Sequence, residues 1–176
     1  IGVARAGNVI GGGDWSSNRL VPDCIKSWSK KQKVLLRNPS STRPWQHVLE
    51  AVGGYLLFAD KLSKNPKLHG EVFNFGPNSR NNFSVLNLVK IMKGHWRNVS
   101  WKIIKMNRLK LYESKLLKLN CSKAKKILKW KSILNFQETA KMTIRWYSKY
   151  YNRPNEILEY TKKQILYYES VMKKKL

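Results

Sequence analysis

The chain has 176 residues, of which 42% are hydrophobic and 11% aromatic. This length fits one domain, or one domain and a piece of another, and the apolar content suffices for a packed core, so we do not expect disorder. No apolar run approaches the roughly 18–20 residues that span a bilayer, and no signal-peptide pattern is present, so we expect no membrane partner. Two cysteines, Cys24 and Cys121, cannot build a disulfide framework, which suits a cytoplasmic protein.

The net charge is +25 and unevenly distributed. Residues 1–60 carry 8 Lys and Arg against 4 Asp and Glu, whereas residues 61–176 carry 27 against 6. Such asymmetry can mark a nucleic-acid surface, because lysines that neutralise phosphates release counterions. Lysine outnumbers arginine 26 to 9 and is spread along the chain, while phosphate and base recognition relies on arginine's planar fork. We interpret most lysines as solvated helix faces and expect no specific nucleic-acid partner.

The first third of the chain alternates between predicted strands and helices. Residues 2–6 predict a short buried strand, and the glycines at 11–13 permit backbone conformations closed to other residues. Pro22 lies in the first turn of a predicted helix that runs to about residue 31. Residues 34–37 predict another strand, and residues 45–48 a brief extended segment.

The next predicted helix begins near residue 49. Its apolar residues follow i, i+3 and i+7 spacing and predict the inward face: Leu49, Val52, Leu56, Ala59 and Leu62. Gly53 and Gly54 each cost the helix about 1 kcal/mol relative to alanine, which indicates close packing against a neighbour.

The remaining elements continue the alternation. Strands are predicted at 71–75 and 101–105, and Ser84 is predicted to cap a helix that runs to about residue 94. Ser122 is predicted to cap a short helix with Ala124, Ile127 and Leu128 facing inward. Two longer helices follow, at about 136–151 and, after Pro154, to about residue 168. The loop at 77–82 is the best candidate for a mobile boundary. The pattern predicts one α/β unit over residues 1–176.

Three polar side chains suggest a binding site near the start of the chain. Asn8 follows a strand, and its amide can point into the cleft at the strand's carboxyl end, although it also suits an ordinary turn. Arg19 at a helix start favours an anion, but an exposed helix-start arginine explains it equally well on sequence alone. Arg43 stands between a Ser/Thr turn and Pro44, so its direction is constrained, and its fork suits pyrophosphate oxygens.

Other site chemistries fail on spacing. The cysteines and histidines show no zinc-ligand spacing, and no Gly-x-Ser-x-Gly elbow occurs, so no metal is expected. We expect Cys24 to be buried in a helix and His47 to bond the backbone. We expect Asp14 to serve a structural turn, although its carboxylate near the cleft could also orient a substrate hydroxyl.

Three stretches carry a resemblance to a known family: GGGDW at 11–15, RPWQHVLE at 43–50 and LNCSKA at 119–124. Together with the strand, glycine loop, Arg-Leu-Val-Pro helix start and isolated arginine, they resemble the extended short-chain dehydrogenase/reductase superfamily. Within it they resemble the CDP-glucose 4,6-dehydratases. The resemblance runs from residue 2 to about residue 169.

The resemblance implies a fold and a set of site residues. The fold is the C-terminal half of an extended Rossmann-type enzyme, with the last strands of a parallel sheet and a small, mostly helical substrate-binding domain. By the same resemblance Asn8 contacts the sugar nucleotide, Arg19 and Leu20 lie beside its sugar and phosphates, Leu36 belongs to the strand that frames the base, and Arg43 binds the pyrophosphate. The implied substrate is a CDP-sugar and the implied cofactor NAD, in a homo-oligomer that serves deoxysugar and polysaccharide synthesis.

Two expected features of that family are absent from the sequence. No G-x-G-x-x-G turn joins a strand to a helix, and no Tyr-x-x-x-Lys pair occurs. We therefore expect the catalytic residues and most NAD contacts in an N-terminal half outside this chain, which would then be inactive alone. The sequence also departs from the family at Tyr112, Glu113, Ser114 and Asn120, so another sugar-nucleotide dehydratase or a 4-epimerase remains open. The alternative of a different class is a non-catalytic basic module for nucleic acid or protein.

Overall fold

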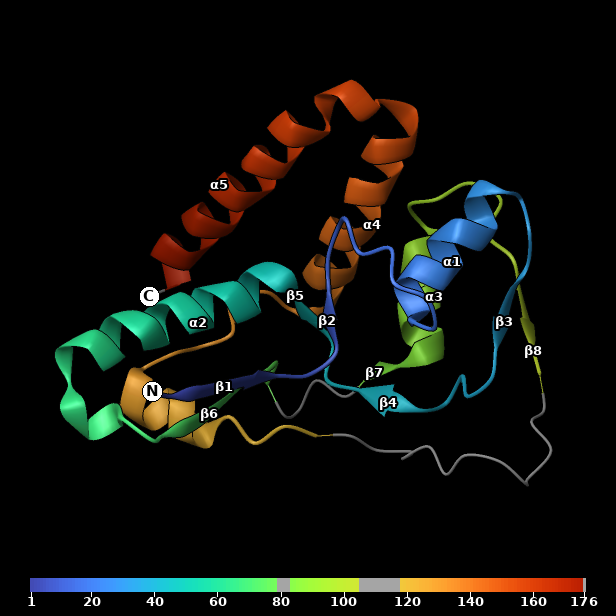
Figure 1. The fold of residues 1–176 in the computed structure, drawn as a ribbon. Coiled ribbons are helices and arrows are strands. Elements are labelled where there is room, and N and C mark those ends of the chain that lie inside the picture. Colours follow the sequence, from blue (N-terminus) through green and yellow to red (C-terminus); the bar gives the residue numbers. More distant parts are fainter. Residues whose placement is uncertain (79–82, 105–117, 176) are drawn as a thin grey trace.

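The structure is a computed structural model, and it describes residues 1–78, 83–104 and 118–175. Figure 1 shows two groups of short strands and helices side by side, with a hairpin of two long helices rising above them. One group contains β1 (Val3–Ala6), β6 (Val72–Phe75) and α2 (Val48–Lys64). The other contains β3 (Val34–Leu36), β8 (Trp101–Ile103), α1 (Leu20–Ser29) and α3 (Val85–Lys93). The predicted α/β class is confirmed.

The first group is built on a parallel pair of strands. β1 (Val3–Ala6) pairs with β6 (Val72–Phe75) in parallel. Helix α2 (Val48–Lys64) packs on this pair, and the rings of Phe58 and Phe73 meet edge to face with centroids 4.7 Å apart. The 3₁₀ turn η1 (Pro66–Leu68) follows α2 and leads the chain into β6.

The expected burial of the first strand is wrong. The side chain of Val3 is 43% exposed, and no described strand pairs with the second edge of β1. In a parallel ladder alternate residues direct their backbone groups to opposite edges. Since Val3 donates its N–H to Glu71, Ala4 directs its backbone to the open edge. An apolar strand is buried only if neighbours cover both of its sides, and the described residues cover one.

The second group encloses the larger core. α1 (Leu20–Ser29) leads into β3 (Val34–Leu36), which pairs in parallel with β8 (Trp101–Ile103). α3 (Val85–Lys93) begins at the predicted cap, Ser84, in a reciprocal capping box with Asn87. Fully buried side chains from these helices fill the interior: Cys24, Ile25, Leu88, Val89 and Met92.

Two very short strand pairs join the groups at the centre. β2 (Val9–Ile10) runs parallel to β5 (Gln46–His47), and β4 (Thr42–Arg43) runs antiparallel to β7 (Phe83–Ser84). These pairs bring residues near 9, 43 and 84 together, although they are far apart in the sequence. They define where the site forms.

The inward face of α2 differs from the predicted stripe. Val52 is 43% exposed and Leu56 67% exposed. The buried residues of the helix are instead Glu50, Ala51, Gly54 and Phe58. Gly54 explains the difference, because a Cβ there would meet the Phe75 ring at 2.4 Å, so the helix approaches β6 along its glycine face.

The C-terminal part begins with a single π-helical turn. η2 (Ala124–Leu128) ends at Lys129 with a left-handed φ of 59°. Ala124 and Leu128 are buried as predicted, but Ile127 is 45% exposed, so its predicted inward orientation is wrong.

The long hairpin consists of α4 (Phe136–Asn152), the turn η3 (Pro154–Glu156) and α5 (Ile157–Lys175). Two bonds tie its arms together: the Trp146 indole donates to Thr161 at 2.8 Å, and the Gln164 amide donates to the Met142 carbonyl at 2.8 Å. Pro154 breaks the two helices as predicted.

Other sequence expectations have varied outcomes. Cys24 and Cys121 are free and buried. Along the described ranges, no helix has the length and apolar character needed to cross a membrane. The predicted mobile boundary falls largely on residues 79–82, and the departure at residues 112–114 also lies outside the described residues.

Candidate functional site

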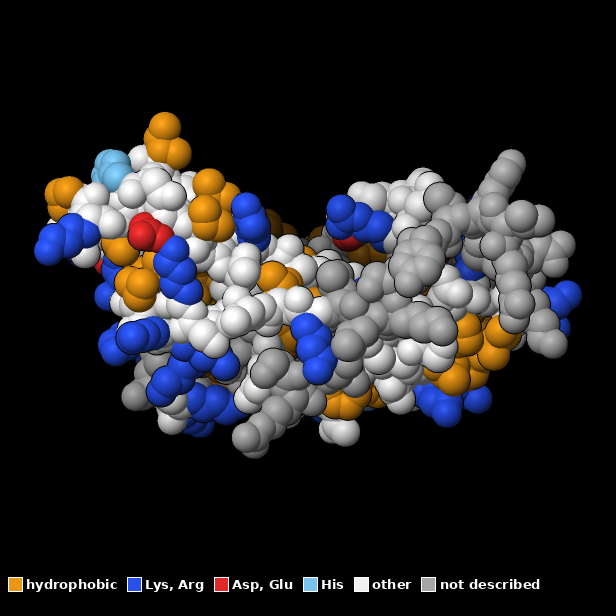
Figure 2. Space-filling model, turned by 90° about the horizontal axis from the view of Figure 1, so that it is seen from below, with side chains coloured by type: hydrophobic (Ala, Val, Ile, Leu, Met, Phe, Trp, Pro, Cys, Tyr) orange, Lys and Arg blue, Asp and Glu red, His pale blue; other side chains and the backbone are white. Residues whose placement is uncertain are grey.

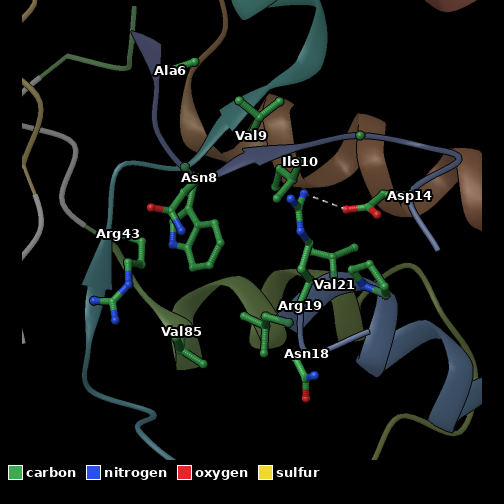
Figure 3. Close-up of a pocket in the computed structure, with 14 residues that line it drawn as sticks. Ala6, Asn8, Val9, Ile10, Asp14, Asn18, Arg19, Val21, Arg43 and Val85 are labelled. Atoms are coloured by element: carbon green, nitrogen blue, oxygen red, sulfur yellow. Dashed lines mark hydrogen bonds and ion pairs between the residues drawn. The ribbon is translucent and has the colours of Figure 1, made fainter. Parts of the chain in front are cut away.

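A pocket of about 490 Å³ opens where the two groups meet. Figure 3 shows Asn8 and Arg43 along one side of it, with Arg19 and Asp14 across from them. Leu20 lines the same pocket, from the first turn of α1. Four of the five residues singled out from the sequence therefore share one pocket, and the fifth does not.

Leu36 lies in an adjoining depression of about 560 Å³. Its side chain is 2% exposed, so it forms part of the wall rather than an accessible contact. Asn18, Leu20 and Val85 line both hollows, so the two adjoin. The predicted residues thus lie along these two adjoining hollows, together called the groove, with Arg43 in the first and Leu36 in the second.

Asn8 occupies an unusual backbone position at the end of β1. Its φ is 42°, in the left-handed region that asparagine tolerates better than most residues. Its carbonyl accepts the Gln46 N–H at 3.3 Å. The Gln46 amide in turn donates to the carbonyls of Gly7 at 3.1 Å and Phe75 at 2.8 Å, which fixes the strand end beside the pocket.

Arg43 is held by the short strand pair β4–β7. It lies opposite Phe83 in the antiparallel register, and its terminal nitrogen donates to the Thr42 carbonyl at 2.8 Å. Trp45, which also lines the pocket, donates its indole N–H to the Phe83 carbonyl at 3.0 Å. Among the described residues, the pairing of β4 with β7 and the bond to the Thr42 carbonyl constrain the direction of Arg43.

Arg19 pairs with Asp14 across the mouth of the pocket. One terminal nitrogen of Arg19 lies 3.3 Å from the Asp14 carboxylate, and the side chains are 63% and 27% exposed. Partial burial by itself would raise the pKa of Asp14. Hydrogen bonds from Ser16 and the charge of Arg19 outweigh this effect and hold the pKa below its ordinary value. Asp14 is thus an anion at neutral pH.

The Asp14 backbone is anchored to α4. The Tyr147 hydroxyl donates to the Asp14 carbonyl at 2.7 Å and accepts the Asp14 N–H at 3.1 Å. Burial raises the pKa of Tyr147, and the Asp14 charge raises it further. The hydroxyl therefore stays protonated. The expected turn role of Asp14 is confirmed by its bond to Ser16 at 3.0 Å, but the link to α4 was not predicted.

His47 lies beside the pocket but does not line it. Its Nδ1 accepts the Leu49 N–H at 3.3 Å, as expected from the sequence. The ring is 2% exposed, and burial lowers its pKa to about 4. It is therefore uncharged at neutral pH and part of the scaffold.

The arrangement suits binding rather than proton transfer. Among the described residues that line the pocket, the polar side-chain groups are two amides, two guanidinium groups, the Trp45 indole and one carboxylate of lowered pKa. Guanidinium groups bind phosphate oxygens by charge-assisted bonds, and an amide suits a hydroxyl. No group of three or more potential metal ligands occurs in the described ranges.

Comparison with known proteins gives two curated relatives, while no protein-family model matches the chain. The CDP-glucose 4,6-dehydratase of Salmonella typhimurium is 40% identical over 94% of this chain. The UDP-glucose 4-epimerase of Mycoplasma pneumoniae is 25% identical over 86% of it. The chain spans about half the length of these relatives, 46% of each.

Solved structures agree with the fold. A UDP-glucuronic acid 4-epimerase from Bacillus cereus, in complex with UDP-glucuronic acid and NAD, matches 83% of the chain and 44% of its own length, with a TM-score of 0.67 and 16% identity. A dTDP-glucose 4,6-dehydratase from Bacillus anthracis, in complex with NAD, matches 84% and 44%, with a TM-score of 0.61 and 20% identity. The chain is thus similar to enzymes of the extended short-chain dehydrogenase/reductase type. It has the fold of the C-terminal portion of these enzymes, as the sequence predicted.

Sequence reasoning missed part of the groove in this extended short-chain dehydrogenase/reductase fold. Val85 lies in the groove because β4 pairs with β7 just before it in the chain, and no local sequence pattern predicts that pairing. Asn18 also lines it, with a left-handed φ of 62°. An asparagine just before a helix start is a turn signal, and it could have been read from the sequence.

Proposed function

We propose that the pocket holds the diphosphate and sugar of a nucleotide sugar. We further propose that the chain is part of an NAD-dependent 4,6-dehydratase that converts CDP-glucose to CDP-4-keto-6-deoxyglucose. The main support for this choice of substrate is the 40% identity to the Salmonella CDP-glucose 4,6-dehydratase. The placement of Asn8, Arg19 and Arg43 around one pocket supports it.

Each residue has a proposed role in holding the substrate. Arg43 binds the pyrophosphate with its planar fork, and Arg19 contacts the phosphates from the start of α1. Asn8 bonds a sugar hydroxyl. Leu20 and Leu36 belong to the apolar wall on which the base rests. The chain would thereby supply orientation, which is a large part of catalysis.

NAD would supply a reversible hydride acceptor, which makes the proton next to the oxidised carbon acidic and so permits loss of water. The glycine loop of this chain does not fit the cofactor's phosphates. A Cβ at Gly12 would meet the Trp146 ring at 2.0 Å, and one at Gly11 would meet Val48 at 2.6 Å. The protein's own side chains fill the space that a dinucleotide turn leaves open. The residues of this glycine loop would therefore not hold NAD.

Two alternatives remain testable. Another sugar-nucleotide dehydratase or a 4-epimerase is supported by the Mycoplasma UDP-glucose 4-epimerase relative, and parallel titrations with CDP and UDP would discriminate. A basic binding module is favoured only by charge. Figure 2 shows Lys and Arg gathered at the end of one face that holds β1, β6 and η2. We propose that the chain has no specific nucleic-acid partner. We also propose that the whole protein is a cytoplasmic homo-oligomer that takes part in deoxysugar synthesis.

The test replaces Arg43 with lysine and titrates CDP by calorimetry. The lysine keeps the charge but loses the fork, and bonds to charged groups contribute about 1.5–3 kcal/mol, so affinity should fall about 10- to 100-fold. Arg153→Lys is the matched control, because that exposed side chain pairs with Glu156 at the far end of α4. Unchanged CDP affinity with a lower melting temperature would make Arg43 a structural residue and displace the proposed pocket.

A further inference from the structure

The pair formed by Asp14 and Arg19 poses a problem for an anion-binding pocket. Asp14 is the sole carboxylate among the described residues that line the pocket. A negative charge beside a bound diphosphate repels it, so Asp14 should weaken the binding proposed above. Figure 3 shows the Arg19 guanidinium turned towards this carboxylate. A carboxylate in this position needs a compensating role.

Asp14 is held rigidly, unlike an ordinary surface carboxylate. Its N–H and its carbonyl both bond the hydroxyl of Tyr147, a side chain with no solvent exposure. Its Oδ1 accepts the Ser16 N–H at 3.0 Å. The neighbouring Trp15 ring packs edge-on against the Tyr147 ring, with centroids 5.3 Å apart. The carboxylate therefore has a fixed place relative to α4.

Arg19, in contrast, has little to fix it besides this carboxylate. It precedes α1 in an extended conformation, and its side chain makes no helix-capping bond. The side chain is 63% exposed, and an exposed arginine samples many rotamers. A ligand that recruits such a side chain must first order it, which weakens binding. A rigid partner on one side of the guanidinium removes part of that cost.

We propose that Asp14 is a positioning residue: anchored by Tyr147 and Ser16, it holds the Arg19 guanidinium over the pocket so that the remaining N–H groups meet the substrate phosphates. The proposal rests on the proposed function, since it needs an anionic ligand. Through the long-range contact between residues 14 and 147, α4 then contributes to substrate binding. The Asp14–Arg19 pair is exposed, so its contribution to ligand affinity is modest. The informative result is whether loss of the Asp14 charge weakens or strengthens ligand binding.

Asp14→Asn separates the two effects of the carboxylate. Removal of the charge alone would strengthen CDP binding, whereas loss of the fixed partner for Arg19 would weaken it. We expect calorimetry to show CDP affinity about three- to fivefold weaker than wild type. In an Arg19→Ala background only repulsion remains, so Asp14→Asn should then strengthen CDP binding. A merely structural role would weaken binding in both backgrounds.

Two further variants complete the test. Tyr147→Phe changes no charge but releases the Asp14 backbone, so it should weaken CDP binding in the wild-type background and leave it unchanged with Arg19→Ala. Asp60→Asn, at an exposed position of α2 paired with Lys64, controls for net charge and should leave CDP affinity unaltered. Thermal melts would verify that each variant folds.

The outcomes distinguish the positioning role from the function on which it rests. Binding of CDP to wild type with equal or tighter binding to Asp14→Asn would overturn the positioning role and leave the function standing. Failure of wild type to bind CDP at millimolar concentration would count against the function itself.

Discussion

Asn8 joins a backbone requirement to a chemical one, and the two can be separated by substitution. Its φ of 42° suits glycine best and asparagine next. Alanine has the strain of a Cβ in this conformation without the polar side chain that lets asparagine adopt it. Asn8→Gly should keep the melting temperature close to wild type but lower CDP affinity about 10-fold, because the hydrogen bond from the side-chain amide to the ligand is lost. Asn8→Ala should lose the same affinity and about 1 kcal/mol of folding stability as well.

Calorimetric titration and chemical denaturation of both variants would check this. If Asn8→Gly binds CDP as tightly as wild type, the asparagine serves only the turn, which was the alternative that the sequence left open. The sequence could single out Asn8, because its position after a strand and before glycines is local information. It could not show the left-handed backbone.

Glu50 is a buried carboxyl with a measurable effect on stability. It is 1% exposed, and its Oε1 accepts the N–H groups of Ile133 at 2.7 Å and Leu134 at 2.5 Å. Burial raises its pKa to about 7 against an ordinary 4.5, although these two bonds oppose the shift. A pKa raised on folding adds stability that is complete below pH 4.5 and is lost as the pH rises through 7.

His47 acts in the opposite direction. Burial lowers its pKa to about 4 from an ordinary 6.5, so its contribution is complete above pH 6.5 and is lost as the pH falls through 4. Between the ordinary pKa values of Glu50 and His47 the two slopes oppose each other.

Glu50→Gln should expose the His47 slope, because glutamine can accept the same two N–H groups without titrating. We expect the free energy of unfolding of this variant to rise with pH from about 4.5 to 6.5, relative to a flatter wild type. The difference between the two proteins should reach at most about 3 kcal/mol near pH 8. Urea unfolding at several pH values measures it, and parallel pH profiles would show that Glu50 does not titrate in this range.

At the scale of elements, α2 shows why periodicity was insufficient. The sequence has one apolar stripe through Val52 and Leu56 and a second face through Ala51, Gly54 and Phe58. Hydropathy favours the first, but a glycine is counted as nearly neutral although it lets a helix approach a strand most closely. The close packing predicted from the two glycines is confirmed at Gly54, whereas a Cβ at Gly53 would make only an ordinary contact.

Gly54→Ala and Gly53→Ala form a matched pair in the same helix turn. A Cβ at Gly54 meets the Phe75 ring at 2.4 Å, whereas one at Gly53 meets the Tyr168 hydroxyl at 3.4 Å. Both substitutions gain about 1 kcal/mol of helix propensity, but overpacking typically costs about 1–3 kcal/mol. We expect Gly54→Ala to destabilise and Gly53→Ala to be neutral or stabilising by up to about 1 kcal/mol. Chemical denaturation decides, and equal effects would contradict the packing seen along Phe75.

At the scale of the whole molecule, contacts between residues close in the sequence could be predicted better than contacts between distant residues. The residues around the pocket that were predicted lie between Asn8 and Arg43, and the pairing of β2 with β5 brings the two ends of this segment together. The contacts that complete the site are long-range: Val85 arrives through β7, and Tyr147 anchors Asp14 from α4. The misjudged burial of β1 has the same origin, since burial depends on partners that lie far away in a chain.

The last prediction concerns the activity of these 176 residues alone. We expect them to bind CDP but to form no 4-keto product from CDP-glucose, even with NAD added. Among the described residues, the pocket offers no group suited to take a proton. The pKa of Asp14 lies low, and the other polar side chains carry amides, guanidinium groups and the Trp45 indole. The glycine loop is also filled by Trp146 and Val48.

Mass spectrometry of the sugar nucleotide after incubation would check this, with the Salmonella relative as a positive control. A 4-keto product made by the chain alone would mean that some of its own residues supply the proton transfer and hold the cofactor, and the division between substrate grip and chemistry would then be wrong. Absence of product together with measurable CDP affinity is the result that would assign substrate orientation, rather than bond-breaking, to this chain.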